Sequence, residues 1–171
     1  MVVEYDKLEW HVEGVFPKGT PPEQGFVHIG MFLTWLILNG LVDLDWAESN
    51  GLLDEVEAVA ARRQTACALR GAIGGTLSSD ELAPEGRAFT AADYTPPFGY
   101  GEDWRRAFGR AADRYAVPDG WATYEAIAPA LDRSYREWVA AGRPEYLPVP
   151  RAVPGWLHRL LRLPTRNKPK E

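Results

Sequence analysis

The apolar run from Phe26 to Leu38 constrains the fold of this chain more than any other feature. Ten of its thirteen side chains are large and apolar, and they cover nearly the whole circumference of a helix. A helix that is apolar on every side is normally buried at the centre of a domain. The run is too short for a membrane span, which needs about 20 apolar residues. We therefore expect a buried central helix that begins near Pro22 and ends before Gly40.

Helical patterns also dominate the rest of the chain. Residues 52–63 combine an apolar stripe with early acids and late arginines, which is typical of an amphipathic helix. In the last long helical segment, Pro129 is expected to kink or restart the helix, and Asp119 to cap it. The further helices are predicted over residues 65–73, 85–93, 102–115 and 120–141.

The N-terminal segment has a different character. Residues 14–25 are too rich in proline and glycine for a helix, and Met1–Tyr5 is a candidate strand that could pair with Trp10–Phe16. The predicted fold is mainly α, a single compact helical domain around a buried central helix, with a short extended or β N-terminal segment. This domain is expected over residues 1–142. Residues 143–171 are expected to form a proline-rich connector, a short basic amphipathic helix and a tail.

Charge is spread unevenly along the chain. Residues 151–171 hold six Arg or Lys and one Glu, whereas residues 1–150 hold thirteen Arg or Lys and twenty-three Asp or Glu. An acidic body disfavours nucleic-acid binding, which needs cations against the phosphates. It favours a basic protein partner, because complementary charge speeds encounter. Plain solubility remains the alternative explanation of this charge.

Familiar enzyme signatures are missing from the sequence. There is no phosphate-binding GxxxxGK[ST] motif and no GxSxG nucleophile motif. Cys67 stands alone in an apolar helical context, so we expect a buried core thiol rather than a nucleophile. A single cysteine also excludes an internal disulfide framework, and the opening MVVEYDKLEW carries no basic leader. We expect a cytoplasmic protein without a cofactor, in which binding is favoured over catalysis.

His11 and His28 are the candidate functional histidines. His28 lies at the start of the central helix, on one stripe with Trp35, and the helix dipole there disfavours an imidazolium. The interpretation we favour is structural: a neutral His28 ring forms a hydrogen bond that pins the N-terminal segment over the helix. The functional alternative is a ligand pocket formed by both histidines with Trp10 and Trp35.

A metal site is not predicted. Two histidines without a third ligand at a regular spacing are weak evidence for zinc. Asp6 or Glu9 would complete such a site, but acidic residues are too common for this to count as a signal.

A second group of candidates lies between residues 94 and 104. Tyr94, Phe98 and Tyr100 predict an exposed aromatic patch that contacts a partner. Glu102 and Asp103 suit either acid–base chemistry or the N-terminus of a helix, and we expect the second. The complete set of candidates for ligand or partner binding is Trp10, His11, His28, Trp35, Tyr94, Phe98, Tyr100, Glu102, Asp103 and Trp104.

The stretch YDKLEWHVEGVFPKGTPPEQGFVHIGMFLTWLILNGLVD resembles a bacterial family of uncharacterised domains with the pattern YDxxxWHxxGxFP followed by HIGMFLxW. The later segments EGRAFTAADY and WATYEAIAPALDRSYREW resemble the same family, so the resemblance covers residues 4–140. The resemblance implies a small cytoplasmic helical protein and indicates no particular chemistry. In size, acidity and lack of catalytic motifs, the chain is similar to immunity proteins of bacterial polymorphic toxin systems.

These observations favour a protein-binding module, most concretely an immunity or antitoxin-like protein. Such a protein would neutralise a toxin by occluding its active site with an acidic, aromatic surface. The alternative is an enzyme or small-ligand-binding protein, which requires that His11 and His28 converge on one cavity. A third hypothesis is a structural subunit that uses its basic tail as a tether.

Overall fold

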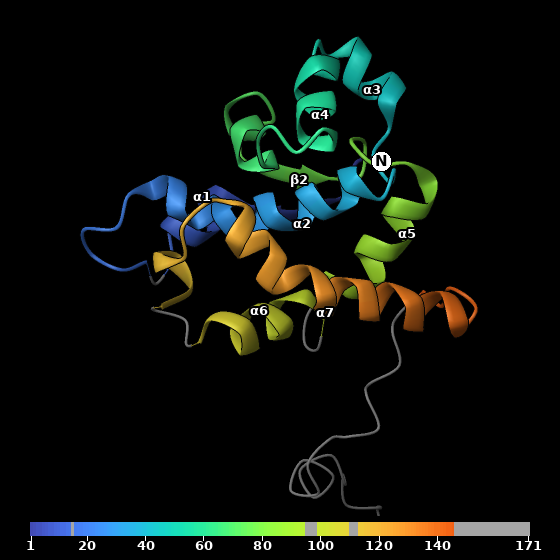
Figure 1. Cartoon of the computed structure of the whole chain (residues 1–171). Helices are drawn as coiled ribbons and strands as arrows, with labels where there is room; N and C mark the ends of the chain where they lie inside the picture. The colour runs from blue at the N-terminus through green and yellow to red at the C-terminus, as the bar shows by residue number, and fades with distance from the viewer. Residues whose placement is uncertain (15, 95–98, 110–112, 146–171) are drawn as a thin grey trace, which may run out of the picture.

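A buried helix, α2 (Val27–Leu38), lies at the centre of the computed structural model (Figure 1). Every residue of α2 from Val27 to Ile37 is buried. The helix follows a 3-10 turn, η1 (Pro22–Phe26), and the chain leaves it at Gly40, whose φ is 67°. The predicted central helix is therefore confirmed, except that its first turn is of the 3-10 type. The structure describes residues 1–14, 16–94, 99–109 and 113–145.

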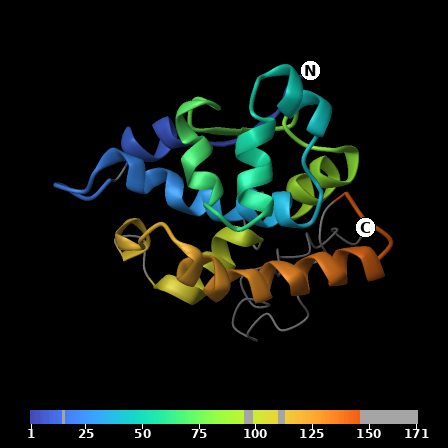
Figure 2. The same ribbon diagram turned by 45° about the horizontal axis from the view of Figure 1, so that its top comes forward.

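Further helical elements surround α2, which confirms the prediction of a mainly α fold. In chain order they are α1 (Leu8–Val12), α3 (Leu44–Ser49), α4 (Leu53–Ala60), η2 (Ala66–Gly71), α5 (Pro84–Asp93), α6 (Tyr100–Phe108), η3 (Asp113–Ala116) and α7 (Trp121–Ala140). Helix α4 and turn η2 pack on one side of α2, and α7 packs on the other side (Figure 1 and Figure 2). Both α5 and α6 contact α7. The central helix thus lies between two helical layers.

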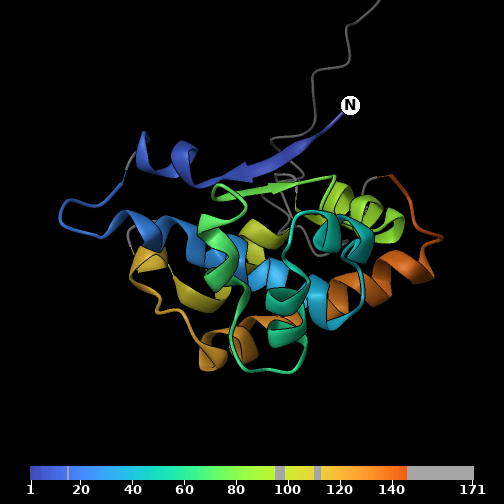
Figure 3. The same cartoon turned by 90° about the horizontal axis from the view of Figure 1, so that it is seen from above.

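The two strands do not pair as the sequence predicted. Strand β1 (Glu4–Lys7) pairs with β2 (Thr76–Ser78) in an antiparallel arrangement, and Figure 3 shows the two side by side. The expected partner, Trp10–Phe16, cannot form a strand because α1 takes up its first residues. The hydroxyl of Ser79, directly after β2, accepts a hydrogen bond from the backbone N–H of Val3.

Several helix ends differ from the predictions for local reasons. The helix predicted over residues 102–115 is interrupted after α6, because Gly109 adopts a φ of 91°. The helix predicted over 52–63 ends at Ala60, and Arg62 follows with a left-handed φ of 57°. The helix predicted over 65–73 is the shorter 3-10 turn η2, and the hydroxyl of its N-cap residue, Thr65, donates to Asp119 at 2.5 Å.

Helix α7 continues through its internal proline. Pro129 lies inside the helix, and Gly120 rather than Asp119 occupies its N-cap position. A proline removes the N–H that would bind the carbonyl four residues earlier, here that of Glu125. Both Pro129 and Glu125 are exposed, so water can bind the freed carbonyl. This position explains why α7 continues through the proline.

Aromatic rings fill the space between α2 and the helices around it. The Phe89 ring of α5 lies 5.2 Å from the Trp35 ring and 5.5 Å from the Trp138 ring, measured between centroids. All three side chains are fully buried. The Trp35 Nε1–H donates to Asp132 Oδ1 of α7 at 2.8 Å, as a buried indole requires. This aromatic core joins α2, α5 and α7.

Within the described residues, each helix is too short or too polar to cross a lipid bilayer. The basic helix predicted within residues 143–171 and the tail after it lie beyond residue 145, outside the described part.

We predict that Gly30→Ala lowers the free energy of unfolding by about 1–3 kcal/mol, because it overpacks the contact between α2 and η2. The new methyl group would collide with the sulfur of Cys67 and lie 3.1 Å from its Cα. The better helix propensity of alanine offsets at most about 1 kcal/mol. The matched control is Gly101→Ala in α6, where nothing lies within 4 Å. Urea unfolding should show a lower midpoint for Gly30→Ala alone, and equal midpoints would contradict the packing described here.

Candidate functional site

Three side chains from the first part of the chain converge on one point. Asp6 lies on β1, His11 on α1, and His28 in the first turn of α2. Asp6 is the buried residue of its strand. Because α1 begins directly after β1, the chain turns back and places His11 beside Asp6. The three side chains, together with Tyr94 at the end of α5, are called the Asp6 cluster below.

The Asp6 carboxylate accepts hydrogen bonds from four donors. Its Oδ1 atom lies 2.8 Å from Nε2 of His11 and 2.7 Å from the backbone nitrogen of Lys7. Its Oδ2 atom lies 3.0 Å from Nε2 of His28 and 2.6 Å from the hydroxyl of Tyr94. An ionised carboxylate only accepts hydrogen bonds, so both Nε2 atoms carry their protons. The predicted bond between His28 and the N-terminal segment is therefore confirmed.

The electrostatics of the cluster favour an ionised Asp6 beside a neutral His28. Burial raises the pKa of Asp6, but the hydrogen bonds from His11 and His28 outweigh it and hold this pKa well below its ordinary value. Burial lowers the pKa of His28 to about 4, against the opposing influence of Asp6. The prediction of a neutral His28 agrees with this shift, although burial rather than the helix dipole is the main cause.

Two residues that the sequence analysis missed complete the surroundings of His11. The hydroxyl of Tyr115 lies 3.1 Å from its Nδ1 atom, and Nη2 of Arg114 lies 3.3 Å from the same atom. Because arginine only donates hydrogen bonds, Nδ1 accepts here. Both residues come from η3, more than a hundred positions along the chain, and no local pattern links them to His11. The rings of His11 and His28 meet edge to face, with centroids 4.5 Å apart.

The predicted aromatic patch is wrong for the residues that the structure describes. Tyr94, Tyr100 and Trp104 are buried, with at most 9% of their surface exposed. Tyr94 is held by Asp6, and the hydroxyl of Tyr100 donates to the backbone oxygen of His28 at 2.6 Å. Both tyrosines can lie in the core because each hydroxyl donates to a buried acceptor. Phe98 lies outside the described residues.

The other candidates are distributed over the surface and the core. Trp35 belongs to the aromatic core, whereas Trp10 on α1 is half exposed. Glu102 forms an ion pair with Arg105, and this hydrogen bond lowers the pKa of Glu102. Asp103 lies 3.7 Å from Arg133. Glu102 and Asp103 therefore lie in the first turn of α6 and form ion pairs there, in agreement with the expected role at a helix N-terminus rather than in acid–base chemistry.

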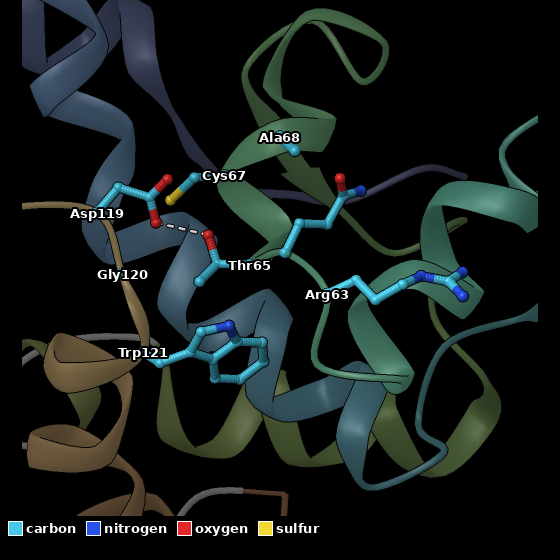
Figure 4. A pocket seen from close by; sticks show the side chains of 8 residues that line it. Arg63, Thr65, Cys67, Ala68, Asp119, Gly120 and Trp121 are labelled. Carbon is cyan, nitrogen blue, oxygen red and sulfur yellow. Dashed lines mark hydrogen bonds between the residues drawn. The ribbon is translucent and has the colours of Figure 1, made fainter.

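A cavity of about 340 Å³ shares no lining residue with the Asp6 cluster, and Figure 4 shows the side chains around it. Cys67 and Ala68 of η2, Asp119, and Trp121 of α7 lie in its wall, and Thr65 donates to Asp119 across it. Burial raises the pKa of the Cys67 thiol well above its ordinary value, so this thiol stays protonated. The protonated state agrees with the expectation of an unreactive thiol, but Cys67 is only partly buried and lines the cavity, so it is not the fully buried core thiol that the sequence predicted.

The hairpin formed by α3 and α4 carries a concentration of negative charge. Its exposed acids take part in no ion pair within the described residues. Leu44 lies among them and is 57% exposed. The acids that define this acidic hairpin are Asp45, Glu48, Asp54, Glu55 and Glu57.

A second buried carboxyl lies at the C-terminal end of α5. Asp93 is 1% exposed, and burial, followed by the nearby negative charge of Asp103, raises its pKa to about 7. The folded protein therefore binds a proton at Asp93 that the unfolded chain releases near pH 4. Stability from this group is present below pH 4 and is lost as the pH rises through about 7. The pKa of His28 is lower in the folded protein, about 4, than its ordinary value of 6.5. Stability from His28 therefore increases as the pH rises from about 4 to 6.5.

We predict that Tyr94→Phe destabilises the protein by about 1.5–3 kcal/mol, because it removes a donor from a buried charged acceptor. The matched control is Tyr5→Phe, whose hydroxyl makes a longer bond of 3.3 Å to the backbone oxygen of Arg87. Its cost should stay below about 0.5 kcal/mol. Thermal unfolding of both variants measures the difference, and similar losses would show that the Tyr94–Asp6 bond is unimportant.

We also predict that the stability of Asp93→Asn, compared with that of the unchanged chain, improves between pH 5.5 and pH 8.5. The gain in the free energy of unfolding should be on the order of 1–3 kcal/mol. Asparagine cannot ionise, so the variant avoids a buried charge at high pH. Asp54→Asn, at an exposed position of α4, is the control and should show no such pH dependence. Urea titrations at the two pH values test this, and parallel behaviour of Asp93→Asn and the unchanged chain would refute it.

The comparisons with known proteins place the chain in a family. No curated protein and no solved structure matches it. A family model with the description "Domain of unknown function (DUF7832)" matches residues 4–117. This span includes the whole Asp6 cluster and the acidic hairpin, but it ends before α7, which the resemblance seen in the sequence included. The chain therefore belongs to the DUF7832 family of domains of unknown function.

Proposed function

We propose that this protein is a cytoplasmic protein-binding module that engages a basic protein partner through its acidic hairpin. The observation that carries the proposal is the group of five exposed acids on α3 and α4, which have no ion-pair partner within the described residues. Surface charge of one sign attracts a partner of the opposite sign and speeds its encounter. The same charge repels nucleic acid.

Helix stability alone does not account for these acids. Asp45 and the pair Asp54 and Glu55 lie in the first turns of α3 and α4, where the helix dipole favours negative charge. Glu48 and Glu57, in contrast, lie in the last turns of the same helices. An acid at that end opposes the dipole and costs about 0.3–1 kcal/mol. A binding role explains why negative charge is kept at both ends.

The hairpin also offers apolar contact area. Leu44 is exposed, and the ring of Trp46, two residues later, is half-buried. Interfaces commonly have an apolar centre, rich in aromatic residues, within a polar rim. Leu44 and Trp46 supply such a centre among the acids. This surface retains the acidic and aromatic character expected from the sequence, but it lies on α3 rather than around residues 94–104.

The specific form of the proposal is an immunity or antitoxin-like role. The partner would be a basic toxin, and the acidic hairpin would cover the cleft in which the toxin acts. Small size and an acidic body support this role. Inhibition of the partner's activity in the complex would distinguish it from simple binding.

A second candidate function is favoured by one observation. His11 and His28 lie together, as an enzyme or small-ligand-binding protein with a site near the N-terminus requires, but they converge on the Asp6 carboxylate rather than on a cavity. The cavity in Figure 4 does not include either histidine. The convergence therefore supports a compact centre for a small ligand rather than a large substrate pocket.

The partner can be identified by placing a photo-crosslinking amino acid at Leu44 and irradiating cells of the native host. The proposal expects one basic protein, covalently attached at this position and not at Gly101 on α6. Crosslinking of the same proteins from both positions would argue against a specific surface.

We predict that Glu57→Lys weakens the complex with this partner five- to tenfold, about 1 kcal/mol or slightly more, and makes the affinity less dependent on salt. The matched control is Glu137→Lys, which reverses an exposed acid in the last turn of α7, on the far side of α2 (Figure 1). Titration calorimetry at two salt concentrations compares the variants. Equal losses from both would show that net charge, and not the acidic hairpin, governs binding.

A further inference from the structure

We propose that Asp6, His11 and His28 form a binding site for a divalent transition-metal ion, with zinc as the best match. This inference concerns the interior of the domain and does not depend on the acidic hairpin or on any protein partner.

Three ligand atoms converge in the Asp6 cluster. One carboxylate oxygen of Asp6 and one ring nitrogen from each histidine all lie within 4.8 Å of one another. Ligands about 2.1 Å from a tetrahedral zinc ion lie roughly 3.4 Å apart. Nε2 of His11 lies 2.8 Å from Oδ1 of Asp6, and Nε2 of His28 lies 3.0 Å from the other oxygen, Oδ2. To bind one ion, both rings would turn until their Nε2 atoms face a point shared with one Asp6 oxygen.

The donor atoms of Asp6, His11 and His28 suit zinc chemically. Two imidazole nitrogens and one carboxylate oxygen are a ligand set that zinc accepts when a fourth position remains for water or another molecule. Calcium and magnesium prefer all-oxygen surroundings, so this set disfavours them. The His11 side chain is 14% exposed and that of Asp6 12%, so solvent reaches both of these candidate ligands.

Neighbouring groups form hydrogen bonds to the candidate ligands. A histidine that binds a metal normally donates its second ring N–H to a neighbour, and a carboxylate ligand is itself hydrogen-bonded. Tyr115 stands 3.1 Å from Nδ1 of His11. Tyr94 and the backbone of Lys7 donate to Asp6 at 2.6 and 2.7 Å. These hydrogen bonds fix the orientation of His11 and Asp6 from the side away from the proposed ion.

Metal binding must compete with the bonds now present. Both Nε2 atoms carry protons that point at Asp6, so each ring must move its proton to Nδ1 before Nε2 can bind an ion. In His11 this places an N–H opposite Tyr115, whose hydroxyl oxygen accepts it. The 3.3 Å contact between Arg114 and Nδ1 of His11 must then break. The test therefore has to separate a metal site from a set of hydrogen bonds that happens to include two histidines.

The test uses the full chain, freed of any affinity tag and treated with a chelator, then titrated with zinc chloride by calorimetry. We expect one zinc ion per chain, a higher melting temperature with zinc, and at least tenfold weaker binding by His11→Gln. The matched control is His158→Gln, which removes the one histidine outside the proposed site and should bind zinc as the unchanged chain does. Circular dichroism checks the fold of each variant.

A second variant keeps the test decisive if His11→Gln fails to fold. Tyr115→Phe removes only the outer hydroxyl and should weaken zinc binding about 10- to 100-fold. X-ray absorption of the zinc-loaded chain should show two imidazole ligands and oxygen. The proposal is overturned if the unchanged chain binds no zinc, if zinc binding survives His11→Gln in a folded variant, or if it disappears with His158→Gln.

Discussion

The structure depends on one buried carboxylate, that of Asp6. An ionised carboxylate away from water is very unfavourable unless donors surround it. Four donors do so here, and they come from separate parts of the chain, including His11 on α1, His28 on α2 and Tyr94 directly after α5. These bonds attach the N-terminal segment to the central helix. They also place two histidines edge to face at a point where no regular sequence spacing would put them.

The Asp6 cluster and the acidic hairpin are separate features with separate consequences. The hairpin packs Val56 and Val59 against the core and turns its acids to the outside, so its surface charge can serve a partner without disturbing the interior. The cluster lies within the core, where the choice of side chains is limited by hydrogen bonding. A protein-binding surface and a small internal metal site can therefore coexist in one domain, and each is tested without the other.

Much of the helical fold follows from the sequence, but the site does so only in part. The run from Phe26 to Leu38 predicts its own burial, and a histidine at the start of that run predicts a buried hydrogen bond. The partner of β1 was not predictable, because β2 is three residues long and distant in the chain. Tyr94 and Tyr100 looked like a surface patch because sequence alone does not reveal the buried acceptors of their hydroxyls. Tyr115 joins the cluster only through tertiary packing.

The central claim is that the bond between Asp6 and His28 couples the N-terminal segment to the central helix. A double-mutant cycle with Asp6→Asn and His28→Gln, measured by urea unfolding, tests it most directly. If the bond couples the two side chains, the losses in free energy of unfolding of the two single variants should sum to about 1–3 kcal/mol more than the loss of the double variant. Losses that simply add, within about 0.5 kcal/mol, would show that the two side chains contribute independently and would contradict the account.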